Sequence, residues 1–286
     1  MCEFKSGIIF KNRVVVAPEG NDSHSDLLES LGIADTTENA MTKFVRAELL
    51  PPDDEWWTNP STWEFNVDQD ITPDWFDEDT EKYEKDFREA VTAWWSEHVL
   101  IDKEVKELST GYYRLYNSKI GTLSGNVVIG TMCGKSTIHA MCDNSTVKNM
   151  CDNSTVRCVY DNSTVQHMRN NSTVEYMCNN FTVECMHDNS TVRHMRDDST
   201  VKDMFGYSTV QYMYDNSTVQ YMRNDSTVEH MRDDSTVEYM CNNSTVKKMW
   251  DNSTVRYMHD NSTIHAMNGN STVQNMNGTS TIRKVK

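Results

Sequence analysis

The chain has 286 residues, of which 37% are hydrophobic and 24% charged, so it can bury one large core or two ordinary ones. Its 43 acidic and 27 basic residues give a net charge of −16, which argues against nucleic acid and an anionic membrane as partners. There is no membrane-length apolar run and no secretion signal, and the eight cysteines lack CxxC spacing. We therefore expect a cytoplasmic protein with reduced thiols and no membrane partner.

Residues 1–100 carry no repeat and predict a small α+β domain, the head. A longer helix is expected over about Glu78–Val99, because apolar residues recur there at helical spacing and acidic residues crowd its amino end. The other expected elements are a hairpin (Gly7–Phe10 with Val14–Val16), a short helix (Ser25–Leu31, stopped by Gly32) and two strands (Phe44–Leu50, Trp63–Val67).

The negative charge is concentrated at the amino end of the chain. Residues 1–119 contain 26 acidic and 12 basic residues, a net −14, which leaves −2 for the remainder. An acidic head is expected to engage a macromolecular partner; the alternative is an ordinary solvated acidic surface.

One group of head residues could support chemistry. His24 lies between the hairpin and the short helix, and Asp68, Asp70 and Asp74 cluster after the second strand. A histidine beside carboxylates can perform acid–base chemistry or bind a metal, but the same residues also make a capped turn. There is no glycine-rich phosphate loop, HExxH motif or nucleophile elbow. We therefore assign no catalytic residue, cofactor or metal, and keep an enzyme or metal-binding head as an alternative.

Residues 101–117 are expected to be a linker and cap, and residues 118–286 repeat every nine residues as x-[D/N]-N-S-T-V-x-x-M. The valine column runs from Ile120 to Ile282 without insertion or deletion, which indicates a solenoid. Ser-Thr-Val, with its β-branched Thr and Val, followed by Asp and Asn predicts a short strand and then a corner.

Charge patterning predicts how many repeats make one coil. The residue after each valine should point outward, and at a spacing of nine this column would stack like charges on neighbouring strands. At a spacing of eighteen no adjacent like pair occurs. We therefore predict a mainly β protein, a β-solenoid of about nine 18-residue coils with two nonapeptide repeats per coil, preceded by the small α+β domain.

The same register assigns the repeated side chains to the inside or the corners. The valine and methionine columns are expected to form the core, where methionine fills irregular space. The asparagine column is expected to form amide ladders at a corner. Its members include Asn144, Asn153, Asn162, Asn171, Asn180 and Asn189.

Aromatic and arginine residues fall into outward columns that could bind a partner. The alternative is that neighbouring rungs only stabilise each other. Phe205-Gly206-Tyr207 replaces a polar corner, which predicts a bend or a partner anchor, and Phe181 stands where serine is expected. Both departures are interpreted as core adjustments. The candidate binding surface comprises Tyr221, Tyr239, Tyr257, Arg196, Tyr214, Arg232, Trp250, Phe205 and Tyr207, and a second column alternates Tyr176, His194, Tyr212 and His230.

Two other functions of repeat proteins fit less well. Cys133 and Cys151 fall on adjacent rungs but Cys142 and Cys178 lie on the other side, so no four-cysteine zinc site is expected. Threonine ladders such as Thr146 and Thr164 suggest ice binding as an alternative. Paired Thr-x-Thr ranks are missing, however, because the second exposed column consists of charged residues and Gln.

The repeat resembles those of short-tandem-repeat β-solenoid proteins. The head segments FKSGIIFKNRVVV, HSDLLESLGI, FVRAELLPP and VDQDITPDWF resemble an uncharacterised domain of bacterial and bacteriophage proteins that is often joined to repeats. The resemblance covers the whole chain. It implies a phage or mobile-element origin, but carries neither an activity nor site residues.

The leading hypothesis is a non-enzymatic protein-binding or self-associating protein, with the acidic head and the solenoid as its binding surfaces. Inhibition of a host protein is one version if the source is a phage. The final repeat, Ser280–Lys286, shows no capping helix, so homo-oligomers could form through the solenoid end. The partner protein itself is not identified by the sequence.

Overall fold

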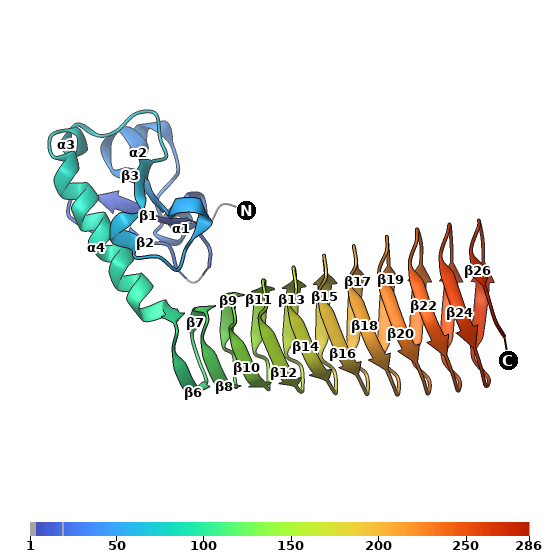
Figure 1. The fold of residues 1–286 in the computed structure, drawn as a ribbon. Coiled ribbons are helices and arrows are strands. Elements are labelled where there is room, and N and C mark those ends of the chain that lie inside the picture. The colour runs from blue at the N-terminus through green and yellow to red at the C-terminus, as the bar shows by residue number, and fades with distance from the viewer. Residues whose placement is uncertain (1–3, 19, 286) are drawn as a thin grey trace. The chain divides into compact units, whose positions relative to one another are not determined.

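The computed structural model describes residues 4–18 and 20–285, which form two compact units. The first extends to Val99 and the second begins at Leu100. The first has helices and a small sheet, and the second is built from stacked strands (Figure 1).

The first unit is the predicted α+β domain. Its sheet has the order β2-β1-β3-β4 and is antiparallel throughout. The strands are β1 (Lys5–Phe10), β2 (Arg13–Val16), β3 (Phe44–Leu50) and β4 (Glu64–Val67). The helices are α1 (His24–Ser30), α2 (Thr37–Thr42), α3 (Asp74–Asp77) and α4 (Thr80–His98), with 3-10 turns η1 (Pro52–Asp54) and η2 (Pro60–Thr62).

Local chemistry explains the bounds and packing of these elements. The Ser23 side chain caps α1 by accepting a hydrogen bond from the Asp26 amide, and Gly32 follows the helix with a φ of +69°. α4 buries Tyr83, Phe87 and Val91 at helical spacing. A Cβ on Gly7 would lie 2.8 Å from the Phe87 ring, so this glycine lets α4 approach β1 closely.

The second unit is a β-solenoid of about ten coils. Two parallel sheets of eleven strands each alternate along the chain: the odd sheet holds β5 to β25 and the even sheet β6 to β26. The strands are β5 (Val99–Ile101), β6 (Glu104–Leu108), β7 (Tyr112–Tyr116), β8 (Lys119–Leu123), β9 (Val128–Cys133), β10 (Thr137–Met141), β11 (Thr146–Met150), β12 (Thr155–Val159), β13 (Thr164–Met168), β14 (Thr173–Met177), β15 (Thr182–Met186), β16 (Thr191–Met195), β17 (Thr200–Met204), β18 (Thr209–Met213), β19 (Thr218–Met222), β20 (Thr227–Met231), β21 (Thr236–Met240), β22 (Thr245–Met249), β23 (Thr254–Met258), β24 (Thr263–Met267), β25 (Thr272–Met276) and β26 (Thr281–Ile282).

The predicted 18-residue coil is confirmed by strand pairing and by charge. Val165 pairs with Val183 in the odd sheet and Val192 with Val210 in the even sheet, each eighteen residues apart. The outward column then pairs opposite charges between rungs. These ion pairs are Arg193–Glu175 (3.0 Å), Lys202–Glu184 (3.1 Å), Lys247–Glu229 (2.6 Å) and Arg256–Glu238 (3.2 Å).

The interior of the solenoid consists of the valine and methionine columns. Both columns are fully buried from β10 to β23. In β12 the methionine position is taken by Val159, which is fully buried as well. The methionines therefore form core, as predicted, and fill the narrow space between the two sheets.

The corners depend on aspartate and asparagine in a left-handed conformation. The first residue of each Asp-Asn pair has a positive φ, for example 54° at Asp215. The Asp215 carboxylate accepts a hydrogen bond from the Asp197 amide one coil earlier (3.3 Å). In the next column Asn144 donates to Asn126 (3.4 Å) and Asn252 to Asp234 (3.2 Å), so the corner ladder mixes amides and carboxylates.

The solenoid begins earlier than the nonapeptide pattern does. Residues 101–117, expected as a linker and cap, contain β6 and β7, which pair in parallel with β8 and β9. Leu115 joins the solenoid core, although this segment lacks the repeat motif. Buried apolar positions and backbone pairing suffice for one further coil.

Candidate functional sites

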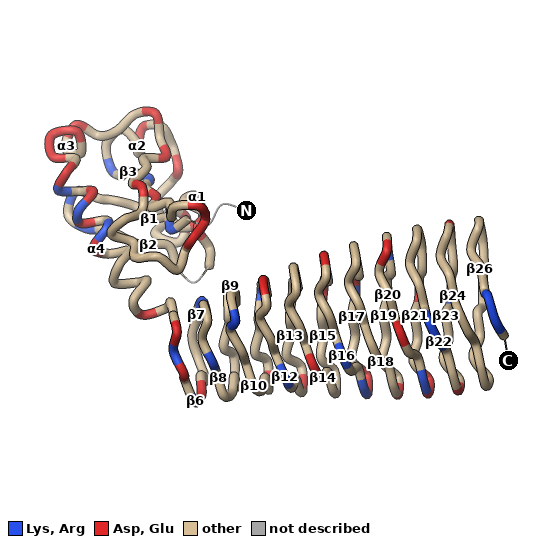
Figure 2. The backbone as a smooth tube through the Cα atoms, in the orientation of Figure 1, with Lys and Arg blue, Asp and Glu red and all other residues tan. Residues whose placement is uncertain are grey.

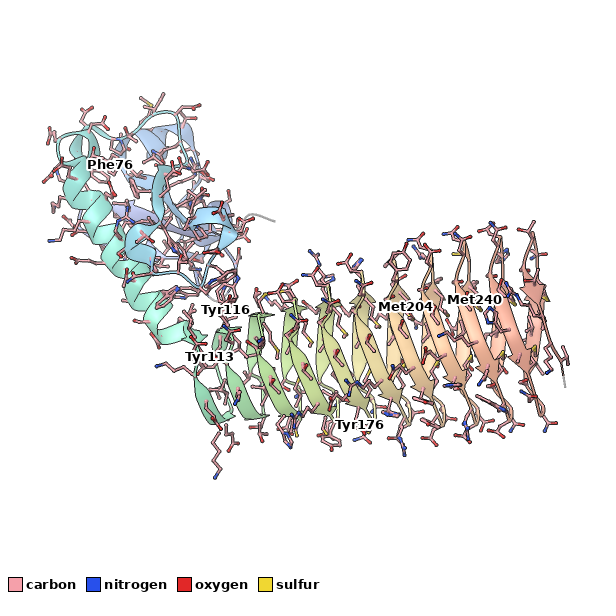
Figure 3. All side chains as sticks on the ribbon, in the orientation of Figure 1. Phe76, Tyr113, Tyr116, Tyr176, Met204 and Met240 are labelled. Carbon is pink, nitrogen blue, oxygen red and sulfur yellow. A yellow bond between two sulfur atoms is a disulfide. The ribbon has the colours of Figure 1, made fainter. Side chains whose placement is uncertain are left out.

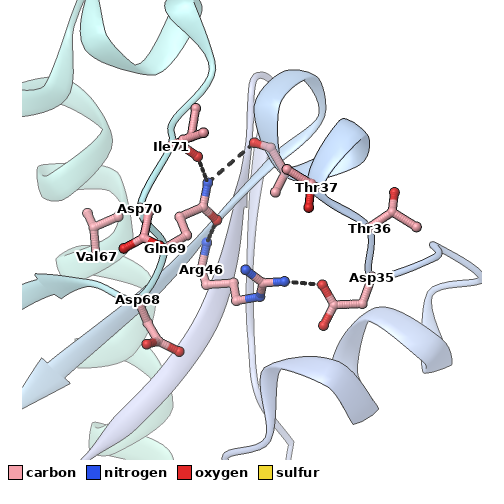
Figure 4. Close-up of a pocket in the computed structure, with 10 residues that line it drawn as sticks. Asp35, Thr36, Thr37, Arg46, Val67, Asp68, Gln69, Asp70 and Ile71 are labelled. Atoms are coloured by element: carbon pink, nitrogen blue, oxygen red, sulfur yellow. Dashed lines mark hydrogen bonds and ion pairs between the residues drawn. The ribbon is translucent and has the colours of Figure 1, made fainter.

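The head contains a polar pocket of about 630 Å³ (Figure 4). Its lining residues come from the loops around α2, from β3 and from the segment after β4; they include Asp35, Arg46, Asp68 and Asp70. The Arg46 guanidinium pairs with Asp35. The Gln69 side chain accepts from the Arg46 amide (2.8 Å) and donates to the Ile71 carbonyl (2.8 Å), which holds the loop in place.

His24 and Asp68 meet, as the alternative head site requires, but His24 is engaged on both sides of its ring. Nδ1 lies 3.1 Å from Asp68 Oδ2 and Nε2 lies 3.2 Å from the Ala47 carbonyl. His24 is buried. Asp70 lines the pocket, whereas Asp74 begins α3 and is not among its lining residues. These contacts connect α1, β3 and the loop after β4, and neither ring nitrogen is directed at open space.

On the even sheet, side chains that flank the buried methionines form two adjacent columns. We define the aromatic–cation face as these eight residues: Tyr176, His194, Tyr212 and His230 before methionine, and Arg196, Tyr214, Arg232 and Trp250 after it. Residues on either side of an inward-pointing methionine share the outer face, which explains the pairing of the columns. Tyr176 projects from the solenoid surface (Figure 3) and is 44% exposed.

Contacts within the aromatic–cation face run from rung to rung. The ring centroids of Tyr176 and His194 are 4.8 Å apart, those of His194 and Tyr212 5.1 Å, and those of Tyr212 and His230 4.8 Å, with interplanar angles of 8°, 11° and 21°. In the second column the Arg196 guanidinium lies 5.1 Å from the Tyr214 ring and that of Arg232 4.9 Å from the Trp250 ring. The predicted cation–π column is confirmed as a structural feature.

A second ladder lies on the odd sheet. Tyr221, Tyr239 and Tyr257 stack with centroid separations of 5.1 and 4.8 Å and interplanar angles of 12° and 9°. In both ladders stacking covers the ring faces between neighbouring rungs, so these faces are not free for nucleobases to stack on.

Burial sets the charge state of the histidines in the aromatic–cation face. Desolvation is the main cause that lowers the pKa of His194 below its ordinary value, and the positive charges of Arg196 and Arg193 lower it further. Desolvation, then Lys248, likewise lowers the pKa of His230. Both rings are therefore neutral at pH 7, and the positive charge of this face comes from arginine and lysine.

The Phe205-Gly206-Tyr207 segment does not interrupt the solenoid, because β17 before it and β18 after it keep the 18-residue register. Gly206 has a φ of 62° and occupies the left-handed position that Asp or Asn takes elsewhere. Phe205 stacks on His187 (5.1 Å, 6°) and lies under Arg223 (5.3 Å). Tyr207 is 68% exposed and is the better candidate for a partner contact.

The cysteine columns yield a contact and a cluster that were not expected. A disulfide joins Cys133 and Cys151, whose Cα atoms are 4.9 Å apart, where reduced thiols were expected. His167, Cys185 and His187 meet on the odd sheet, with one donor atom of each within 4.8 Å of the others. The 18-residue spacing could have revealed this cluster, since it places His167 opposite Cys185.

Comparison of the chain with family models, with curated proteins and with solved structures finds no match. In the described part of the chain, no helix combines the length and the apolar character needed to cross a membrane.

Proposed function

We propose that this protein is a non-enzymatic binding protein whose solenoid presents the aromatic–cation face to an acidic protein partner. The observation that carries the proposal is the concentration of arginine, tyrosine and tryptophan on the outer surface of the even sheet. These residue types dominate the binding energy of protein interfaces.

Charge on the even sheet supports an acidic partner. Within the even-numbered strands from β12 to β22 the acidic side chains are Glu175 and Glu229, and both have basic partners on the next rung. Further acidic residues, such as Asp197 and Asp233, lie in the adjacent corner. Arg196 and Arg232 instead lie against aromatic rings and have no carboxylate partner among the described residues. The basic residues on this surface are Arg157, Arg193, Arg196, Arg232, Lys247 and Lys248. Complementary charge on a partner would orient its approach.

The head supplies a surface of opposite sign. Acidic residues outnumber basic ones there, including around α3 (Figure 2). A basic macromolecule is the matching partner for this unit, which makes the whole chain a scaffold with two kinds of surface. Inhibition of a host protein by a phage protein is one form of this proposal and rests on the sequence resemblance.

The test compares full-length variants as bait in a bacterial lysate. Arg196→Ala/Arg232→Ala/Trp250→Ala changes the aromatic–cation face, and Arg223→Ala/Arg256→Ala/Tyr239→Ala is the matched control on the odd sheet. We expect the wild type and the control to retain a common acidic protein, and the first variant to retain at least about tenfold less. Raised salt should weaken the interaction.

Two results would contradict the proposal: no protein retained by the wild type, or equal retention by both triple variants. The alternative of head chemistry makes a different prediction, namely an activity abolished by His24→Gln with the solenoid unchanged. Ice binding predicts thermal hysteresis, which the proposed function does not.

A further inference from the structure

Three metal-ligand side chains meet on the outer surface of the odd sheet. His167 on β13 is the direct cross-strand neighbour of Cys185 on β15, and His187 follows two residues after Cys185. Cys185 and His187 flank the buried Met186, so both side chains lie on the outer surface. One donor atom from each of the three lies within 4.8 Å of the others. The regular register therefore brings together two imidazoles and one thiol.

The donors of this cluster are available. His167 Nδ1 is buried and has no hydrogen-bond partner among the described residues, a costly state for a polar atom. Cys185 is a free thiol. The His187 ring is held in place by stacking on Phe205 (5.1 Å, 6°). The same nitrogen is unpartnered in His194 and His230, which occupy the equivalent position on the even sheet. What distinguishes His167 is therefore its placement beside a free thiol and a second imidazole.

The charged side chains around the cluster leave a small excess of negative charge, which suits a cation. Asp188, Asp203 and Glu184 place negative charge nearby, whereas Arg169 and Lys202 oppose it.

We propose that His167, Cys185 and His187 form a zinc-binding site that joins two rungs of the solenoid. Each histidine supplies one nitrogen lone pair, and Cys185 loses its proton to bind as a thiolate. One proton is therefore released for each zinc bound. Water or a neighbouring carboxylate takes the fourth tetrahedral position.

The donor set and its spacing both favour zinc. Imidazole nitrogen and thiolate sulfur are the ligands that zinc takes in proteins, whereas calcium and magnesium require oxygen. Tetrahedral zinc with these bond lengths separates its donors by about 3.5 Å, so side-chain adjustments of about 1 Å would complete the site. This cluster lies on the sheet opposite the aromatic–cation face and is independent of the proposed binding function.

The other two groups of potential ligands suit zinc less well. Cys133 and Cys151 are joined in a disulfide. The His24 group has one imidazole and no thiol, and His24 Nε2 faces the Ala47 carbonyl. Among the described groups, His167, Cys185 and His187 are thus the one with two imidazoles and a free thiol.

The test uses the full-length protein, stripped of metal with a chelator and handled under nitrogen without a reductant, so that the Cys133–Cys151 disulfide stays closed. Titration with Zn²⁺ against a chromophoric chelator should show one tight equivalent per chain. Titration with Co²⁺ should produce a thiolate charge-transfer band in the near ultraviolet. Cys185→Ser should remove the band and weaken zinc binding more than about 100-fold, because losing a direct ligand exceeds the effect of losing an outer partner.

Matched controls separate ligand loss from a general effect. Cys178→Ser removes a half-buried thiol from the even sheet, and His265→Asn removes an imidazole outside the cluster; both should bind zinc as the wild type does. His187→Asn should weaken binding with the Cys185 thiol intact. Far-ultraviolet circular dichroism checks that each variant is folded. The proposal is overturned if folded wild type and Cys185→Ser bind zinc equally, or if the controls lose binding equally.

Discussion

Phe181 illustrates how a single departure from the repeat is absorbed. It stands where serine is expected and its side chain is fully buried in the solenoid core. At the same position one repeat later, Ser190 is also buried, but its hydroxyl has no hydrogen-bond partner among the described residues. The corner therefore accepts a large apolar side chain at one rung without disturbing the register.

This gives a residue-scale prediction. Phe181→Ser restores the repeat motif but should lower the free energy of unfolding by about 3 kcal/mol, because it leaves a cavity in the core. Ser190→Ala should change it by less than about 0.5 kcal/mol, since it removes an unpaired hydroxyl. Denaturant unfolding monitored by circular dichroism measures both. A loss for Phe181→Ser no larger than that for Ser190→Ala would contradict the assignment of Phe181 to the core.

At the scale of the strand, the outward charges stabilise specific rung neighbours. Glu238 and Arg256 form an exposed pair at 3.2 Å, and the next residues in their column are Gln220 and Gln274. Arg256→Glu should lower the free energy of unfolding by about 0.5 kcal/mol, because it places like charges on adjacent strands. Adding Glu238→Arg should restore stability, since the outer neighbours are neutral. Thermal unfolding of the wild type, the two single variants and the double variant at low salt measures the coupling. If the effects of the two single changes simply add in the double variant, the two residues do not form a stabilising pair.

The stacked histidines make stability depend on pH. The folded pKa values of His194 and His230 lie below their ordinary value of 6.5, so the unfolded chain takes up protons first. Stability should fall as the pH drops from about 6.5 through the lowered folded pKa values, and should be unaffected by these groups above that range. His187 and His265 shift in the same direction and add to the effect.

The variant His194→Gln/His230→Gln tests this assignment. It should show a shallower loss of thermal stability between pH 7.5 and pH 5 than the wild type, because two of the shifted groups are removed. Equal slopes for the two proteins would place the pH dependence elsewhere.

At the scale of the whole molecule, the two units have separate cores. One core of the head gathers Ile8, Leu28 and Phe44, whereas the solenoid core runs continuously from Leu115 to Met267. The two units should therefore unfold in separate transitions. Six of the seven tryptophans lie in the head, and Trp250 is the exception.

Fluorescence of the Trp250→Phe variant should thus report the head alone, while far-ultraviolet circular dichroism is dominated by the solenoid strands. We expect the two signals to give different midpoints in a denaturant titration. Coincident midpoints would mean that the units unfold as one cooperative block.

The repeat pattern alone predicts the solenoid, its 18-residue coil and the buried methionines, because a strict repeat places every residue of a column in one environment. The sequence also predicts most elements of the head, where helical spacing and strand alternation are clear. That residues 101–117 form a further coil is seen only in the fold, because backbone pairing with the next strands requires no sequence motif.

The structure alone also decided which side chains meet in detail. In the fold both nitrogens of His24 face oxygen acceptors, and Asp74 is not among the residues that line the pocket. His167 lies beside Cys185 and His187. Such contacts depend on side-chain direction, burial and the packing of segments distant in sequence. A one-dimensional pattern specifies these only where the repeat itself fixes the neighbour.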